Sequence, residues 1–360
     1  MFTRIAALLA ACVTALHILT APASASPYGL RCLIDTWAAR PEIPGVSLEV
    51  RGLGVRFREA AGLFAENGRR LRPTDAFRTA SVTKSITAAT LLRLAEQRKV
   101  RLDAPVSTYL DMAKVPNGAD MTVRQLLDHT AGLYDYVTDP AWREAVIADP
   151  QRTWTPDELL EWGLTRGRPY FKPGEGYHYS DTGYILAGRV IEKVYGKALH
   201  HAYRDLVFRP LGMRDTYLEH WERPRAPRPL SHAYFGEIDT RDWNPTFDTF
   251  GGGGLVSTSA DLTRFARGLF EGRLFGHADT LPTMLKATPQ SGGRYSLGLV
   301  KTRLGGEEAW GHSGFFGAFF LYVPAQGLSI AGTVNQSDAD QGELVTQAYG
   351  HVAGTLSCPR

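Results

Sequence analysis

The stretch "TASVTKSITAATLL", Thr79–Leu92, has the character of a helix start and carries a single charge, on Lys84. Its other residues are small, hydroxylated or apolar. Ser81 lies three positions before Lys84, a spacing that places both side chains on one helix face. The residues that extend this face are uncharged, so we expect the Lys84 side chain to be buried. Those residues are Thr87, Ala88, Leu91 and Ala95.

An ammonium group hidden from water beside a hydroxyl favours nucleophilic chemistry. Burial lowers the pKa of a lysine unless a partner compensates, and a desolvated amine can accept the proton of Ser81. Free N–H groups at the helix N-terminus can stabilise a developing oxyanion. A serine N-cap followed by a solvated lysine fits the same letters, because Ser-x-x-Lys is a short motif.

Tyr179 lies in "YHYSDTGY", Tyr177–Tyr184, just before an expected helix start. A phenol can shuttle a proton when a nearby cation lowers its pKa, and Lys84 could be that cation. The structural alternative is that Ser180 or Asp181 caps the helix while Tyr179 packs in the core.

His312 lies on an expected strand within "WGHSGFFG", Trp310–Gly317. A histidine can relay protons near neutral pH, and Gly314 would let a ligand or another backbone approach closely. A lone strand histidine is also common as a structural residue, so this stretch alone assigns no role.

Strand patterns lie at both ends of the chain and helical patterns fill the middle. Apolar and polar residues alternate from 46 to 57, and strand-like runs occupy 295–334. Helical patterns precede the first strands and follow the last. We therefore expect an α+β fold in which an antiparallel sheet, flanked by N- and C-terminal helices, carries an inserted, mostly helical lobe. Residues 26–79 and about 256–360 would form the sheet lobe, and residues 80–255 the helical lobe.

Composition excludes some classes of function. The chain has 360 residues, of which 44% are hydrophobic and 21% charged, which suits one large two-lobed domain or two smaller ones. The net charge is +3 without a long basic run, so we expect no nucleic-acid partner. No His-Glu-x-x-His or paired Cys-x-x-Cys indicates a metal, and "GGGG", Gly251–Gly254, lacks the Gly-Lys-Ser/Thr of a phosphate loop. We expect a monomer without cofactor that acts on a small-molecule or peptide substrate.

The N-terminus resembles a secretory signal peptide. Arg4 precedes a mostly apolar run, residues 5–19, and Ala23-Ser24-Ala25 offers a cleavage site near Ala25. The run is too short for a comfortable membrane span, and no later segment is long and apolar enough. We expect a secreted or periplasmic protein, with a lipoprotein as the alternative because Leu9–Cys12 resembles a lipoprotein cleavage box.

Removal of residues 1–25 leaves two cysteines, Cys32 and Cys358. They can pair in an oxidising compartment, which requires that the two chain ends meet. Two free thiols are the alternative, and we favour the bond.

Taken in order, the three polar motifs resemble those of the penicillin-recognising serine hydrolases: class C β-lactamases, D-alanyl-D-alanine carboxypeptidases and related esterases. Ser81–Lys84 matches their Ser-x-x-Lys, Tyr179–Asp181 stands where they carry Tyr-x-Asn, and His312–Gly314 matches Lys/His-Thr/Ser-Gly. The similarity covers nearly all of the mature chain. It extends to "LLDHTAGL", "FKPGEGYHYSDTGYILAGRVIEKVYGK" and "GGGGLVSTSADL".

The resemblance implies a role for each motif. Ser81 would be the nucleophile, Lys84 its activator, and Tyr179 the group that exchanges protons with nucleophile and leaving group. His312 would stand by Tyr179 as a cation or hydrogen-bond partner. The backbone N–H groups of Ser81 and Phe315 would form the oxyanion hole. Residues implied on the substrate-binding side are Asp181, Ser313, Gly314 and Phe315.

Two departures from the family pattern bear on the substrate. Asp181 replaces the usual asparagine, and a carboxylate accepts hydrogen bonds but cannot donate, which weakens recognition of an acylamino carbonyl. Asp181 could still pair with Lys84. His312 replaces the lysine of class C β-lactamases, and Val300 stands where carboxypeptidases can place an arginine. The histidine points toward the carboxypeptidase and esterase branches, and the missing arginine weakens a carboxypeptidase relative to a general esterase or amidase. We expect an exported serine hydrolase, with a D-alanyl peptide, a β-lactam and a carboxylic ester as the open alternatives for its substrate.

Two other interpretations remain. An α/β-hydrolase would use Ser313, Asp338 and His351 in that order, but "GHSGF" breaks the Gly-x-Ser-x-Gly pattern at Phe315. A non-turnover penicilloyl-binding or sensor domain would stay acylated on Ser81. Persistence of the acyl group separates that alternative from a hydrolase.

Overall fold

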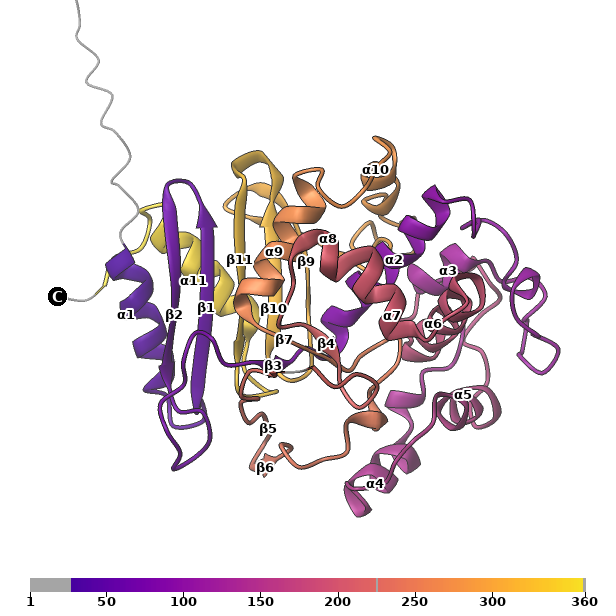
Figure 1. Cartoon of the computed structure of the whole chain (residues 1–360), viewed down its shortest axis with the longest axis horizontal. Coiled ribbons are helices and arrows are strands. Elements are labelled where there is room, and N and C mark those ends of the chain that lie inside the picture. The colour runs from indigo at the N-terminus through magenta and orange to yellow at the C-terminus, as the bar shows by residue number, and fades with distance from the viewer. Residues whose placement is uncertain (1–26, 225, 359–360) are drawn as a thin grey trace, which may run out of the picture.

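A six-stranded antiparallel sheet forms one end of the molecule in the computed structural model, which describes residues 27–224 and 226–358 (Figure 1). The strands follow the order β2-β1-β11-β10-β9-β8, so the first hairpin of the chain pairs with its last strand. The expected α+β fold with a sheet built from both chain ends is therefore confirmed. The strands are β1 (Gly45–Gly52), β2 (Val55–Gly62), β8 (Val300–Leu304), β9 (Glu307–Ser313), β10 (Ala318–Val323) and β11 (Leu328–Val334).

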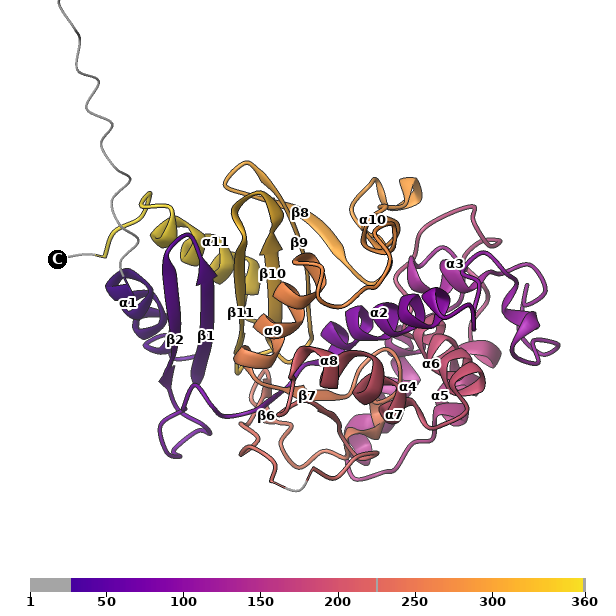
Figure 2. The same ribbon diagram turned by 45° about the horizontal axis from the view of Figure 1, so that its top comes forward.

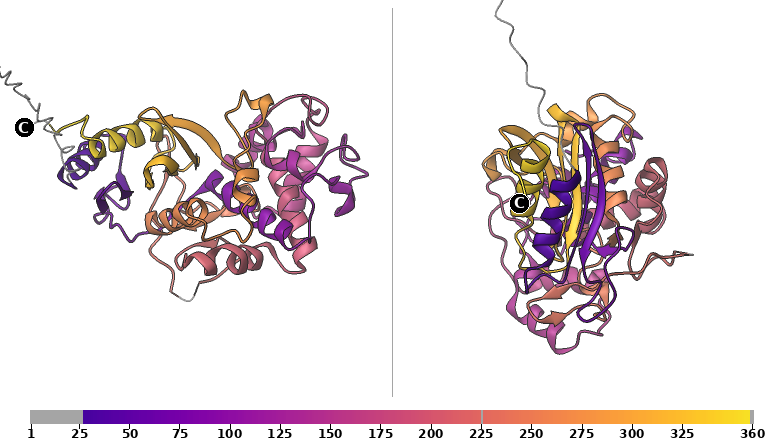
Figure 3. Two further views of the ribbon diagram at one scale, coloured as in Figure 1. Left: turned by 90° about the horizontal axis from the view of Figure 1, so that it is seen from above. Right: turned by 90° about the vertical axis from the view of Figure 1, so that its left-hand side faces the viewer.

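Helices cover both faces of this sheet. One face packs on α1 (Pro27–Ala38) and α11 (Gln341–Val352), and the other packs on α9 (Ser259–Phe270) (Figure 3). Apolar and polar residues alternate along β1, yet the polar Ser47 and Glu49 are buried as well, because α9 packs on this strand. A two-residue period shows which side chains share a face but not what covers that face.

The helical lobe lies between β2 and α9 in the chain. Two of its helices begin with the capping boxes that their sequences predict, at Thr122 with Gln125 and at Thr155 with Glu158. The lobe boundaries near residues 79 and 256 stay a prediction. Its helices are α2 (Thr83–Glu96), α3 (Val123–Leu127), α4 (Pro140–Ala148), α5 (Pro156–Thr165), α6 (Asp181–Tyr195), α7 (Leu199–Tyr203) and α8 (Arg209–Leu211), and α10 (Thr280–Met284) follows α9.

Short strands and turns complete the structure. A three-stranded sheet has the order β3-β7-β4, and β5 pairs with β6 in a separate hairpin. The strands are β3 (Phe77–Arg78), β4 (Tyr217–Leu218), β5 (Tyr234–Phe235), β6 (Ile238–Asp239) and β7 (Leu255–Ser257). Single helical turns occupy Ala80–Val82, Val106–Thr108, Tyr136–Thr138, Arg204–Phe208, Pro245–Phe247, Pro289–Ser291 and Pro324–Gln326.

Helix α2 runs from the edge of the sheet into the helical lobe (Figure 2). The loop before β8 packs on this helix: a side chain at Gly298 would place its Cβ 2.7 Å from the Lys84 carbonyl oxygen. Gly298 also has a φ of 71°, which favours glycine. The strand expected over residues 295–301 therefore starts only at Val300. The N-terminus of α2 lies where both lobes can contribute side chains.

The two chain ends meet at α1 and α11, where Cys32 and Cys358 form a disulfide with Cα atoms 6.3 Å apart. The expected signal peptide, residues 1–25, lies outside the described residues. Among the described residues no helix has the length and apolar character needed to cross a bilayer.

Replacing Cys32 and Cys358 by serine is expected to lower the free energy of unfolding by about 2–5 kcal/mol, because the bond restricts the unfolded chain. The two residues are 326 positions apart, so the closed loop is long. Urea unfolding of the oxidised protein and of the double variant measures the difference. Reduced wild-type protein is the control and should match the variant. Equal stability of the oxidised protein and the variant would argue against the bond in solution.

Candidate active site

The N-terminus of α2 holds a partly exposed hydroxyl next to a fully buried ammonium group. Ser81 lies in the helical turn Ala80–Val82, and the preceding Ala80 has a φ of 42°, a strained conformation for a residue other than glycine. Lys84 has 0% of its surface exposed, so its predicted burial is confirmed. Its Nζ donates to Ser81 Oγ at 3.0 Å and to Asp181 Oδ1 at 2.5 Å. The carbonyl oxygen of Gly252 accepts a third bond at 2.9 Å, so every Nζ proton has a partner.

The charge of Lys84 depends on its partners in the site. Burial lowers the pKa of Lys84, but the Asp181 carboxylate and the Tyr179 phenol raise it, and the pKa lies above the ordinary lysine value. The ion pair with Asp181 is thus the partner that compensates for burial, and the pKa of Lys84 does not fall. Lys84 is an ammonium ion in the resting protein.

Two further carboxyl groups lie near this ion pair. The backbone N–H of Asp181 donates to Asp135 Oδ1 at 3.0 Å. Burial, together with the charge of Asp181, raises the pKa of Asp135 and of Asp248 to about 7. Both groups interact electrostatically with Lys84, so the ammonium ion is the cation for a cluster of three carboxyl groups. Sequence reasoning missed Asp135 and Asp248, since neither belongs to a recognisable motif.

Tyr179 reaches the same site from the segment that precedes α6. Its phenol interacts with both Lys84 and Ser81, and Lys84 Nζ lies 4.8 Å from the ring centroid. Burial raises the pKa of Tyr179, and Lys84 only partly opposes this rise. Lys84 lowers this pKa as expected, but the effect of burial is larger, so the phenol keeps its proton near neutral pH.

His312, on β9, contributes a neutral imidazole. Its Nδ1 donates to the Ser313 carbonyl oxygen at 2.7 Å, so Nε2 accepts from the Tyr295 hydroxyl at 3.1 Å. Burial and the charge of Lys84 lower the pKa of His312 to about 3. Its ring lies 6.3 Å from the ring of Tyr179. His312 is thus a hydrogen-bond partner rather than a cation, and its partner is Tyr295, which the sequence did not single out for this role.

The turn after β9 lies directly against the residues before Ser81. A side chain at Gly314 would place its Cβ 2.0 Å from the Thr79 carbonyl oxygen, so only glycine permits this approach. The contact brings the segment that continues into Phe315 next to the turn Ala80–Val82. The Phe315 side chain is 50% exposed, and its ring centroid lies 5.3 Å from that of Phe235 on β5.

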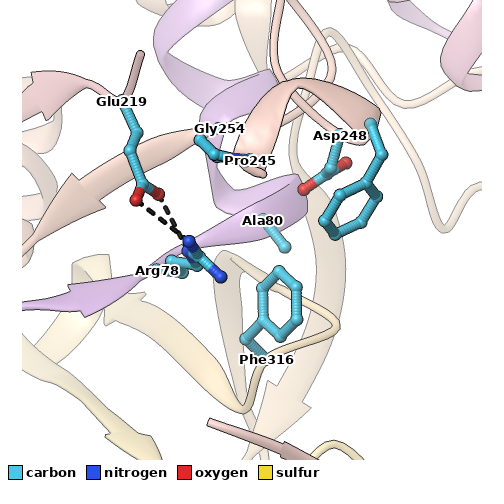
Figure 4. Close-up of a pocket in the computed structure, with 8 residues that line it drawn as sticks. Arg78, Ala80, Glu219, Pro245, Asp248, Gly254 and Phe316 are labelled. Carbon is cyan, nitrogen blue, oxygen red and sulfur yellow. Dashed lines mark hydrogen bonds and ion pairs between the residues drawn. The ribbon is translucent and has the colours of Figure 1, made fainter. Parts of the chain in front are cut away.

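A small pocket adjoins Ala80, with Asp248 and Phe316 in its wall. Figure 4 shows Arg78 and Glu219 joined on one side of it, Asp248 on the other, and Ala80 between them in this view. Arg78 binds Glu219 through two hydrogen bonds of 2.8 and 3.0 Å and also donates to a backbone carbonyl of the loop that follows β6. These bonds fix the loop beside the turn Ala80–Val82.

The residues of the α/β-hydrolase alternative are not brought together. Ser313 is exposed at the end of β9. His351 instead packs on α1, where a Cβ at Gly29 would lie 2.8 Å from its Nδ1. The α/β-hydrolase alternative is wrong, because its acid–base residue, His351, lies on α11 against α1.

The sequence matches the β-lactamase family over residues 33–353. It is 36% identical over 210 residues to the esterase EstB of Burkholderia gladioli, a match that covers 56% of this chain and 53% of that protein. The solved structure of a D-stereospecific amidohydrolase from Streptomyces sp. superposes with a TM-score of 0.78 at 31% identity, covering 90% of this chain and 98% of the other. A D-amino acid amidase from Ochrobactrum anthropi SV3 superposes with a TM-score of 0.79 at 26% identity, covering 91% and 98%. The matches span only 53–55% of the length of the first curated relatives.

Proposed function

The chain belongs to the β-lactamase family, whose members are serine hydrolases that act on amides or esters, and we propose that it forms an acyl-enzyme on Ser81. The observation that carries this proposal is the 3.0 Å hydrogen bond between the buried Lys84 Nζ and Ser81 Oγ. Few other reasons exist to bury an ammonium ion beside a solvent-accessible hydroxyl, since burial of a charge is unfavourable.

In the proposed acylation step, Ser81 Oγ attacks the carbonyl carbon of the substrate. The Ser81 proton moves to Lys84 Nζ while an ammonium proton moves to Asp181, so the ion pair accepts the proton as a unit. The backbone N–H groups of Ser81 and Phe315 stabilise the oxyanion, and Gly314 supports this arrangement through its close contact with residue 79.

Departure of the leaving group then restores the site. Tyr179 donates its phenolic proton to the leaving group, Lys84 returns a proton to Tyr179, and Asp181 returns one to Lys84. The net transfer is of the Ser81 proton to the leaving group. Water repeats the sequence in the opposite direction, releasing the acid and returning a proton to Ser81 Oγ. His312 holds Tyr295 beside Tyr179 and takes no part in proton transfer, because it is neutral and bonded on both ring nitrogens.

We propose carboxylic esters and simple amides as the substrate class. Asp181 offers no donor to an acylamino carbonyl, and its Oδ1 is occupied by Lys84, which disfavours penicillins and acylated D-alanyl peptides. The exposed rings of Phe235 and Phe315 lie beside the proposed oxyanion hole and favour an apolar acyl or leaving group. The likeness to an esterase and to amidases is consistent with this choice.

We also propose that the protein is exported. The support is the signal-like sequence of residues 1–25 and the Cys32–Cys358 disulfide, a bond typical of oxidising compartments. The expected monomer likewise stays a prediction.

Intact-mass spectrometry tests the acyl-enzyme. With a nitrophenyl ester of a short aliphatic acid, acid quenching within the first turnovers is expected to trap one acyl group, and peptide mapping should place it on Ser81. A fluorescent penicillin should label the protein much more slowly. Heat-denatured protein is the control for non-specific acylation and should carry no adduct.

Two outcomes contradict the proposal in different ways. An adduct on another residue would reject Ser81 as the nucleophile. A penicilloyl adduct that persists for hours, without ester turnover, would instead support the non-turnover binding or sensor domain.

A further inference from the structure

His129 is a buried residue that the proposed reaction does not use. It lies in "LLDHTAGL", Leu126–Leu133, and only 2% of its surface is exposed. Its φ of 62° is in the left-handed region, which is unfavourable for a residue other than glycine and persists where surrounding contacts hold it. Its ring packs against the rings of four tyrosines, Tyr177, Tyr179, Tyr184 and Tyr295, which provide such contacts.

His129 binds the backbone on both sides of Tyr179. Its carbonyl oxygen accepts a hydrogen bond of 3.1 Å from the backbone N–H of His178. Its Nδ1 accepts a second bond, also 3.1 Å, from the backbone N–H of Ser180. Its ring lies 4.2 Å from the Tyr179 ring at an angle of 34°. Residue 179 is therefore held through both neighbours and across its ring.

The His129 imidazole can accept the Ser180 hydrogen bond because it is neutral. Burial, together with the nearby charge of Lys84 and the neighbouring histidines, lowers the pKa of His129 well below its ordinary value. Nδ1 is thus free to accept from Ser180, and the ring proton resides on Nε2. That Nε2 is buried without a hydrogen-bond partner among the described residues. A buried donor without a partner lowers the stability of the fold, so stability alone does not explain this histidine.

We propose that His129 is a positioning residue, which sets the place of the Tyr179 phenol relative to Ser81 and Lys84. This inference rests on the proposed function, in which Tyr179 transfers protons. Small displacements of a catalytic group by a remote change can reduce rates about 100-fold. His129 therefore acts on the reaction through Tyr179, without contact with the substrate.

Kinetics of His129→Ala with a nitrophenyl ester test the inference. We expect kcat to fall about 100-fold with a smaller change in KM, because the phenol is displaced while the substrate surface is retained. His129→Asn keeps an acceptor close to the position of Nδ1 and tolerates a positive φ, so it should recover about tenfold of the loss. His220→Ala is the matched control: His220 also has a positive φ, of 69°, but is exposed and makes none of these contacts, so activity should not change.

A double-mutant cycle distinguishes a displaced Tyr179 phenol from a general loss of structure in the His129→Ala variant. In a Tyr179→Phe background, His129→Ala should lower kcat less than about twofold further, since no phenol remains to be positioned. A further 100-fold loss in that background would overturn the proposal, as would a His129→Ala enzyme of full activity. Full activity of Tyr179→Phe with an inactive Ser81→Ala would overturn the positioning role but leave hydrolysis on Ser81 intact. Full activity of Ser81→Ala would overturn both.

Discussion

Replacing Ser81 by alanine is expected to lower kcat/KM for a nitrophenyl ester at least about 1,000-fold, because the attacking oxygen is lost. The fold should be preserved. Lys84 keeps its bonds to Asp181 and to the Gly252 carbonyl oxygen, so the ammonium ion remains paired. The free energy of unfolding should therefore change by less than about 1 kcal/mol. Steady-state kinetics and urea unfolding on one protein preparation measure both quantities.

Ser85 provides a matched control for this variant. It lies one helical turn after Ser81, is buried, and donates to the Gly298 carbonyl oxygen at 2.6 Å. Ser85→Ala should lower stability by about 1 kcal/mol through the lost hydrogen bond, yet retain most of the activity. If Ser81→Ala kept a tenth of the wild-type rate, or if Ser85→Ala were the inactive variant, the assignment of the nucleophile would be rejected.

The sequence predicts the parts of the site that depend on local periodicity. The uncharged helix face around Lys84 indicated its burial, and the three-residue spacing indicated its contact with Ser81. Strand alternation at both chain ends predicted the antiparallel sheet. These features follow from the geometry of one helix or one strand, which a few neighbouring residues determine.

The charge state of the site could not be predicted in this way. The raised pKa of Lys84 depends on Asp181, which lies 97 residues further along the chain. Asp135 and Tyr295 contribute through contacts that only the tertiary fold creates. A short motif indicates candidate groups, but the protonation of each group depends on distances across the assembled site.

The loop before β8 illustrates the same limit for the fold. Its sequence, "YSLGLVK", has the residue types of a strand. Gly298 instead turns the chain onto α2, so that only Val300 and later residues join the sheet. The turn also brings Tyr295 to His312. A β-propensity pattern therefore predicted a strand where tertiary packing produced part of the site.

Replacing Lys84 by methionine is expected to abolish detectable turnover and to lower the free energy of unfolding by about 3–5 kcal/mol. Activity is lost because no amine remains to accept the Ser81 proton. Stability is lost because Asp181, which is buried, keeps a carboxylate without its cation. Urea unfolding and ester kinetics measure the two effects.

The double variant Lys84→Met/Asp181→Asn distinguishes these two effects. Removing both members of the ion pair leaves no unpaired buried charge, so most of the lost stability should return. Activity should not return, because the amine is still absent. A double variant as unstable as Lys84→Met would show that the buried carboxylate is not the cause of the loss.

Asp181→Asn alone tests how the ion pair sets the pH dependence. In the wild-type protein Asp181 raises the pKa of Lys84 against the effect of burial. Without that carboxylate, burial dominates and the pKa of Lys84 falls. Lys84 alone must then accept the Ser81 proton, so the kcat/KM profile of the variant should gain an acidic limb at the lowered pKa of Lys84, below which the ammonium ion has no carboxylate to take its proton. A variant that keeps the wild-type rate and gains no such limb would mean that Lys84 does not accept the Ser81 proton, even if Lys84→Met is inactive.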